Sequence, residues 1–388
     1  MTIFSYEAAE LFGCLEQGRE DILVLDVRNE KDFSRFRVES PKPFALSNIS
    51  YYRFMEQEQE SAAQVPKDRS VRIICAKEGS AKYVAEILEK HGWKDVGYMA
   101  GGIKSWGNML VPKLAFQGPD YELHQFIRPG KASCSYGLIC GKEMMLFDPS
   151  RNTEFYLQFA AQKGCRISKT FETHLQADYI AGSRSVAEQT GAAFHANPGD
   201  FASSKMPYLP LHDGGIHRFS SGGPEVTAIF TPGHTPGSTC YLIGGSHLLT
   251  GDTVFLSSVG RPDLGGQAEA WAAQLHRSLG RLQQLDPDIR VLPGHYMDWT
   301  EADARLIFTA RLSEIIERNK AIYSLPGEAD FIQFIKDNLR PQPEEYALIR
   351  RINAGLEQVD PDRAEELDLG KNECAATAYA KAKAGQTA

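Results

Sequence analysis

The sequence predicts an α/β protein with two domains: an N-terminal α/β domain with a parallel sheet, then an αββα sandwich with a helical C-terminal extension. Three observations predict this class. The chain has 388 residues, more than one hydrophobic core usually supports. Its first part alternates buried-strand patterns with an amphipathic helix, and its later part contains many short β-prone runs between glycines and prolines. We expect domains at residues 1–113 and 121–304, a linker at 114–120 and the extension at 305–388.

In the N-terminal part, ILVLDVR (22–28) and SVRIICA (70–76) are apolar runs that suit buried parallel strands. AKYVAEILEKHG (81–92) places Val84, Ile87 and Leu88 on one helical face and ends at Gly92, a common helix stop. This unit finishes near GGIKSWG (101–107). Residues 112–120 carry Pro and Gly without periodicity, which is typical of a linker.

The second part is β-rich, with helices predicted at 152–164 and 269–285. Helices that enclose strands favour two sheets packed between helical layers. From about residue 301 the chain becomes helix-rich. The predicted strands lie within SYGLIC, KEMMLFD, CRISKTFETH, EVTAIFTPG, STCYLIGG and SHLLTGD.

Composition narrows the classes of function. The formal net charge of −8 and the lack of a Lys/Arg cluster argue against nucleic acid and anionic membranes as partners. No run of 18 apolar residues occurs and the N-terminus lacks a signal-peptide pattern, so we expect a cytoplasmic protein. Seven cysteines without a C-x-x-C pair argue against a disulfide framework. A homodimer is compatible with the sequence.

The first chemical site is Cys75, at the end of a predicted strand and before a helix that Ser80 can cap. A loop of this kind directs backbone N–H groups at the sulfur, and Lys77 can add positive charge, so we expect a pKa for Cys75 below that of a free thiol. The loop residues are Ala76, Lys77, Glu78, Gly79 and Ser80.

This segment resembles the rhodanese (sulfurtransferase) family, as do LDVRNEKDF (25–33) and YMAGGIKSWG (98–107). The resemblance implies that Cys75 carries a sulfane sulfur as a persulfide. The related phosphatases need an Arg six positions after the Cys, where this chain has Ala81. The direction of sulfur transfer, and whether thiosulfate or a persulfide is the donor, stay open.

The second site is a set of five potential ligands, each just after an apolar β-run. They lie in THLQADYIAG, TPGHTPGSTC, LLTGDTVF and VLPGHYMD: His174, Asp178, His234, Asp252 and His295. Ligands on loops at strand ends converge at one edge of a sheet. Their order resembles the metallo-β-lactamase superfamily over roughly residues 120–300.

Two histidines of the two-zinc signature H-x-H-x-D-H are replaced, by Gln176 and Tyr179. Neither an amide nor a neutral phenol is a good zinc ligand. The remaining His174, His234 and Asp252 form the two-His, one-carboxylate triad that non-haem Fe(II) enzymes use for oxygen chemistry.

The chain resembles the persulfide dioxygenases of this superfamily in LFDPSRNTEFY (146–156), in GRPDL (260–264) and in a C-terminal arm containing LRPQPEEYALIRRIN and LGKNECA. That resemblance implies one Fe(II) per chain and a reaction in which O2 converts a low-molecular-weight persulfide, of glutathione or a similar thiol, to sulfite and the thiol. Joining this domain to a sulfurtransferase raises the effective concentration of the shared sulfur carrier.

Further residues have provisional roles. We expect Asp178 and His295 to orient a metal ligand or a bound water. Tyr179 either hydrogen-bonds a ligand on the iron or only packs, and Arg261 either anchors an anionic group of the substrate or is an ordinary surface residue. Two other functions stay open: a zinc-dependent thioester hydrolase like glyoxalase II, with a metal-activated hydroxide, and a non-enzymatic sulfur relay or sensor that uses Cys75.

Overall fold

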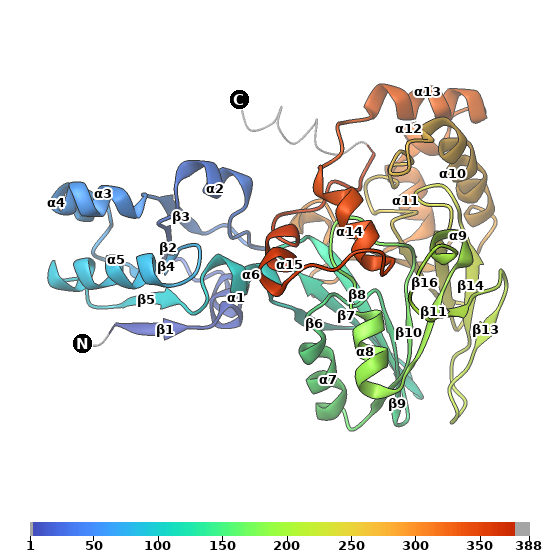
Figure 1. Ribbon diagram of the computed structural model, residues 1–388, viewed down its shortest axis with the longest axis horizontal. Helices are drawn as coiled ribbons and strands as arrows, with labels where there is room; N and C mark the ends of the chain where they lie inside the picture. Colours follow the sequence, from blue (N-terminus) through green and yellow to red (C-terminus); the bar gives the residue numbers. More distant parts are fainter. Residues whose placement is uncertain (1–2, 377–388) are drawn as a thin grey trace. The chain divides into compact units, whose positions relative to one another are not determined.

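The computed structural model describes residues 3–376 and divides into two compact units (Figure 1). The first unit contains the chain up to Val111 together with residues 128–131 and 369–371, and the second contains the rest. No helix in the described residues is both long and apolar enough to cross a membrane.

The first unit is built on a parallel five-stranded sheet, as predicted. The strand order is β1 (Phe4–Tyr6), β5 (Val96–Met99), β4 (Ser70–Ile74), β2 (Ile22–Asp26) and β3 (Ala45–Asn48). Central strand β2 is buried at all five residues, which explains its continuous apolar run. The helices are α1 (Ala8–Gln17), α2 (Glu30–Arg35), α3 (Tyr51–Glu56), α4 (Glu58–Ala63), α5 (Gly79–Lys90) and α6 (Ile103–Asn108).

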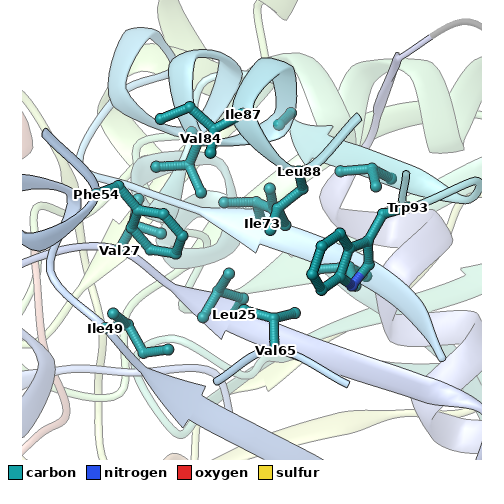
Figure 2. Packing of buried hydrophobic residues seen from close by; sticks show 14 of the residues in the cluster. Leu25, Val27, Ile49, Phe54, Val65, Ile73, Val84, Ile87, Leu88 and Trp93 are labelled. Carbon is teal, nitrogen blue, oxygen red and sulfur yellow. The ribbon is translucent and has the colours of Figure 1, made fainter. Parts of the chain in front are cut away.

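The core of this unit lies between the sheet and helices α3, α4 and α5 (Figure 2). Val84 and Leu88, one helical turn apart on α5, are fully buried, as is Ile73 on β4. Trp93, just after the Gly92 helix stop, packs into the same cluster and donates its indole N–H to the carbonyl of Pro66 at 3.0 Å. The predicted apolar face of α5 is therefore the face that covers the sheet.

The second unit contains two sheets. The first has the order β12 (Leu209–Pro210), β11 (Ala193–Ala196), β10 (Arg166–Phe171), β9 (Glu143–Phe147), β8 (Ser133–Cys140), β7 (Tyr121–Arg128) and β6 (Val111–Gln117). The second has the order β13 (Ile216–His217), β14 (Val226–Phe230), β15 (Thr239–Ile243), β16 (His247–Gly251), β17 (Arg290–Pro293) and β18 (Ala310–Arg311).

The two sheets pack face to face through aromatic side chains. Tyr241 of β15 lies with its ring 5.2 Å from that of Phe147 on β9 and 5.3 Å from that of Phe171 on β10. Its hydroxyl donates to the backbone carbonyl of Glu172 at 2.7 Å. These contacts form an inter-sheet core like that of other sandwiches.

Helices cover this sandwich and continue into the predicted C-terminal extension. Helices α7 (Thr153–Gln162) and α8 (Ser183–Thr190) pack on β10, and α10 (Ala268–Leu282) packs against α13 (Glu328–Asn338). The shorter helices are α9 (Pro198–Phe201), the 3-10 helix Trp299–Glu301, α11 (Leu312–Arg318), α12 (Lys320–Tyr323), α14 (Glu345–Asn353) and α15 (Pro361–Leu367). The αββα class with a helical extension is confirmed.

The prediction of a linker at residues 114–120 is wrong for residues 114–117, which belong to β6. Strand β6 is the edge of the seven-stranded sheet, and every residue in it is at least partly exposed. An edge strand tolerates Pro112, because one side of its backbone needs no ladder partner. The proline and the weak apolar pattern therefore indicated an edge position and not an irregular segment.

Candidate metal centre and persulfide loop

Three predicted ligands meet at one point of the second unit. His174 follows β10, His234 follows β14 and Asp252 follows β16, so both sheets contribute. Asp252 Oδ2 lies 3.5 Å from His234 Nε2 and 3.8 Å from His174 Nε2. All three side chains are buried, and their ligand atoms lie within 4.8 Å of one another.

The atoms that face this point are His174 Nε2, His234 Nε2 and Asp252 Oδ2. Within residues 3–376, none of the three has a hydrogen-bond partner, although each is fully buried. Buried polar atoms without partners are rare in folded proteins. Burial lowers the pKa of His174 to about 3 and also lowers that of His234, so both imidazoles stay neutral with lone pairs available. The set fits one metal ion bound by two imidazoles and one carboxylate.

The other ring nitrogen of each histidine, Nδ1, is held by a hydrogen bond. Thr173 Oγ1 donates to Asp148 Oδ2 at 2.9 Å and lies 2.9 Å from His174 Nδ1. Because the single hydroxyl proton goes to Asp148, Nδ1 must donate to Thr173. His234 Nδ1 likewise donates to the carbonyl of Arg261 at 2.9 Å. These bonds fix the tautomer that leaves each Nε2 free to bind a metal.

His295 lies between two carboxylates. Its Nδ1 is 2.7 Å from Asp252 Oδ1 and its Nε2 is 2.9 Å from Asp178 Oδ2. Burial alone lowers the pKa of His295, but the charges and hydrogen bonds of Asp178 and Asp252 outweigh it and raise the pKa to about 10. Both ring nitrogens therefore donate, and neither offers a lone pair. The structure thus places His295 against the ligand Asp252 and Asp178 against His295, and their expected role in orienting a metal ligand or a bound water stays a prediction.

The two residues that stand in place of histidines, Gln176 and Tyr179, both contact Asp148. Gln176 Nε2 donates to Asp148 Oδ1 at 3.2 Å, and the hydroxyl of Tyr179 donates to the Asp148 backbone carbonyl at 3.2 Å. Both side chains are buried. Asp148 itself has a φ of 51°, in the left-handed region that costs a non-glycine residue energy and often marks functional sites. Of the two roles considered for Tyr179, these contacts favour packing.

The sequence did not single out Asp148 and Thr173. Their signal was present: Asp148 directly follows the apolar run MMLF, and Thr173 precedes the first ligand. Only the pairing of β9 with β10 shows that they meet, since this pairing places Phe147 opposite Phe171.

Arg261 is buried and its guanidinium bonds within the fold. Its Nε and Nη2 donate to the carboxylate of Asp263 at 2.7 and 2.8 Å, and Nη1 donates to the carbonyl of Glu373 at 3.2 Å. A further bond reaches the carbonyl of Arg340. These contacts favour a structural role over the substrate anchor that we considered, and they exclude the surface position.

The C-terminal extension fastens the loop that carries His174 and Asp178. Asn353, at the end of α14, donates to the carbonyls of Gln176 and Tyr179 at 2.9 and 2.8 Å and accepts from the N–H of Ala181 at 3.0 Å. Asp368 accepts from the N–H of Ile180 at 3.1 Å. No local pattern in the sequence indicates these contacts, because the partners lie more than 170 residues apart.

Cys374 is a further buried residue that the sequence did not indicate as part of the site. Its thiol lies within 4.8 Å of ligand atoms on Asp178 and His295. Burial, together with the charges of Asp178 and Asp252, raises the pKa of Cys374 well above that of a free thiol. The group is thus a neutral thiol beside the metal centre.

In the first unit, Cys75 follows β4 and precedes α5, as predicted, and the loop 76–80 lies between them. Its carbonyl accepts from the N–H of Ile103 at 2.8 Å. Gly102 has a φ of 64°, and a Cβ there would lie 2.5 Å from the Cys75 carbonyl oxygen, so only glycine fits this approach.

Two predictions about this loop are wrong. Helix α5 begins at Gly79 with Glu78 as its N-cap, so Ser80 lies inside the first turn and does not cap the helix. The pKa of Cys75 is raised, because the burial of the thiol outweighs the opposing backbone N–H groups of Lys77, Ser80 and Ala81. Lys77 is exposed.

Two family models match the chain. The rhodanese-like domain matches residues 9–109, and the metallo-beta-lactamase superfamily matches residues 129–295. The protein therefore combines a rhodanese-like domain with a metallo-beta-lactamase superfamily domain. Members of the metallo-beta-lactamase superfamily bind metal ions.

Among curated proteins, the hydroxyacylglutathione hydrolase of Acidiphilium cryptum (strain JF-5) is 36% identical over 142 residues, which are 37% of this chain and 55% of that protein. The hydroxyacylglutathione hydrolase of Anaeromyxobacter dehalogenans (strain 2CP-C) is 34% identical over 168 residues, 43% of this chain and 63% of that protein. The chain thus spans between about half and two thirds of the length of these curated relatives.

Among solved structures, a metallo-beta-lactamase from Staphylococcus aureus subsp. aureus COL is 28% identical with a TM-score of 0.56, and the match covers 62% of this chain and 75% of that one. ETHE1 from Myxococcus xanthus is 24% identical with a TM-score of 0.52, and covers 61% of this chain and 99% of that one. The second likeness is one of fold.

Proposed function

We propose that this protein is a mononuclear non-haem Fe(II) persulfide dioxygenase fused to a rhodanese-type sulfurtransferase. One observation carries the proposal: the only two imidazoles and one carboxylate that converge with unpartnered ligand atoms in residues 3–376 are His174, His234 and Asp252. The other group of potential ligands contains His295, whose nitrogens both donate to carboxylates. One metal with three protein ligands and open positions is the arrangement of oxygen-activating iron.

The overall reaction balances as R-S-SH + O2 + H2O → R-SH + SO3²⁻ + 2 H⁺. Iron(II), when bound, would supply the redox chemistry that joins O2 to the terminal sulfur. The chain's own residues determine how the metal ligands are oriented. Thr173 and the carbonyl of Arg261 orient the two imidazoles, while the cationic His295 holds Asp252 by one oxygen and leaves the other to face the metal.

The rhodanese-like domain would exchange sulfane sulfur with the same small thiol through Cys75. Its neutral thiol is the resting form, and attack on a sulfur donor requires the thiolate. The backbone N–H groups of Lys77, Ser80 and Ala81 favour that anion. The same groups would favour a persulfide anion on Cys75.

A second candidate is a zinc-dependent thioester hydrolase. It is favoured by the curated relatives, which are hydroxyacylglutathione hydrolases. That chemistry is expected to use two metal ions, and two metal ions need more protein ligands than the three that converge here.

Metal analysis joined to activity separates the candidates. Full-length protein purified without added metal should contain about one iron per chain and consume O2 with glutathione persulfide, with His174→Ala as the background. Two zinc ions per chain with hydrolysis of an acylglutathione would replace the proposal by the second candidate. If neither activity exceeds the background, a sulfur relay through Cys75 is the remaining candidate.

A further inference from the structure

Asp200, on α9, lies between the two loops that carry the histidine ligands. Its Oδ2 accepts from the backbone N–H of Leu175 at 2.8 Å and from the hydroxyl of Thr235 at 2.7 Å. These two residues directly follow His174 and His234 in the sequence. One carboxylate oxygen therefore joins the two loops at the positions next to both imidazoles.

The backbone on either side of Asp200 is fixed in place. The side chain of Asn197 caps α9 by accepting from the N–H of Gly199 at 2.9 Å, and its amide donates to the hydroxyl of Thr239 at 3.0 Å. The next residue, Phe201, is buried in an apolar cluster. The carboxylate of Asp200 is thus held from its own side as well as by the two loops.

The loop that follows His234 is built to meet this carboxylate. Its second oxygen, Oδ1, accepts from the N–H of Gly237 at 2.8 Å, and a Cβ at Gly237 would lie 2.6 Å from Asp200 Cγ. Ser238 Oγ accepts from the N–H of Thr235 at 3.0 Å and lies 2.9 Å from its hydroxyl oxygen. Because the hydroxyl proton of Thr235 goes to Asp200, Ser238 donates to Thr235 and fixes its orientation.

The two imidazoles need a contact that keeps them together. Nε2 of His174 and Nε2 of His234 both lie near Oδ2 of Asp252, and the two rings lie edge to face with centroids 4.9 Å apart. Three acceptor atoms that face one point in a buried site repel one another and are shielded from the solvent. The loops that carry the histidines must therefore be held in place by other contacts.

We propose that Asp200 is a positioning residue of the metal centre, which holds the loops of His174 and His234 at the separation that one metal ion requires. Asp200 belongs to neither group of described residues that could hold a metal ion, so it acts through Leu175 and Thr235. The inference rests on the metal site of the proposed function, and it depends neither on the identity of the metal nor on the reaction with O2.

The test measures binding of Co²⁺ to metal-free full-length protein. Competition with a chelator gives the affinity, and the visible absorption of bound Co²⁺ reports the arrangement of its ligands. Asp200→Ala should weaken binding about 10- to 100-fold, the usual effect of losing a residue that orients metal ligands, and should change the absorption spectrum. Asp200→Asn keeps an oxygen for both Leu175 and Thr235, so it should bind Co²⁺ more tightly than Asp200→Ala does.

Two further variants separate positioning from general stability. Asp303→Ala is the matched control, because Asp303 is also partly buried and accepts from the N–H groups of Arg305 and Ile307 at 2.8 and 3.0 Å, within the loop before β18. This variant should lose stability and bind Co²⁺ like the wild type. Thr235→Val should weaken binding by less than Asp200→Ala, and combining the two should add no further loss, because both remove the same bond.

An Asp200→Ala protein with the Co²⁺ affinity and absorption spectrum of the wild type would overturn the inference, whatever its stability. An equal loss of affinity in Asp303→Ala would also overturn it, because weaker binding would then follow from lower stability alone. If Asp200→Ala does not fold, wild-type affinity in Thr235→Val has the same force. The expected Co²⁺ results without O2 uptake by the iron-bound wild type would reject the dioxygenase and retain the role of Asp200. O2 uptake together with unchanged Co²⁺ binding in Asp200→Ala would reject that role alone.

Discussion

Replacing Thr173 by Val tests the view that a hydroxyl group prepares His174 for the metal. Valine keeps the shape of threonine and removes only the oxygen, which donates to Asp148 and accepts from His174 Nδ1. Both partners are buried. A buried group that loses its partner costs about 1–3 kcal/mol. Two such losses that share one network are not additive, so we expect about 2–4 kcal/mol of lost stability.

The more specific effect is on metal affinity. Loss of a residue that orients a metal-bound histidine typically weakens binding about 10- to 100-fold. The assay is competition with a chelator of known affinity, with thermal unfolding of the metal-free protein in parallel. Thr170→Val is the matched control, because the buried hydroxyl of Thr170, on β10, donates to the carbonyl of Ser183 at 3.3 Å and not to a group of the metal centre. A Thr173→Val protein that binds metal within twofold of the wild type would refute the reasoning.

Gly260→Ala should prevent metal binding, because a Cβ there would lie 1.9 Å from the carbonyl oxygen of Asp252. Gly280→Ala is the control: a Cβ at this position of α10 would meet nothing within 4 Å, so this variant should gain about 0.5–1 kcal/mol of stability in denaturant titrations. Cys75→Ser should abolish persulfide formation, followed by mass spectrometry, while O2 uptake with supplied persulfide continues; loss of both activities would contradict separate sites. Burial lowers the pKa values of His195 and His217 to about 4, below the usual value of about 6.5. Between these two pH values the unfolded protein therefore binds more protons than the folded protein does. The free energy of unfolding should be highest above pH 6.5 and should fall as the pH is lowered toward 4. Denaturant titrations of a His195→Phe, His217→Phe protein should show less of this loss, and an unchanged pH profile would contradict the assignment.

The sequence predicted the convergence of His174, His234 and Asp252 because a ligand at the end of a strand is a local pattern. It did not predict the sharing of Asp148 by Thr173, Gln176 and Tyr179, because that depends on which strands pair. The pKa of Cys75 was misjudged for a related reason: the loop's N–H groups can be read from the sequence, but the depth of burial cannot.

The contacts of Asn353 and Asp368 have a consequence for synthesis. The loop with His174 leaves the ribosome about 180 residues before the side chains that fasten it, since translation runs from the N-terminus. A nascent chain that already contains all three metal ligands still lacks these two clamps. The centre can therefore reach the geometry described above only after Asn353 and Asp368 have been synthesised and have reached the loop, so we expect stable metal binding to follow the synthesis of these residues.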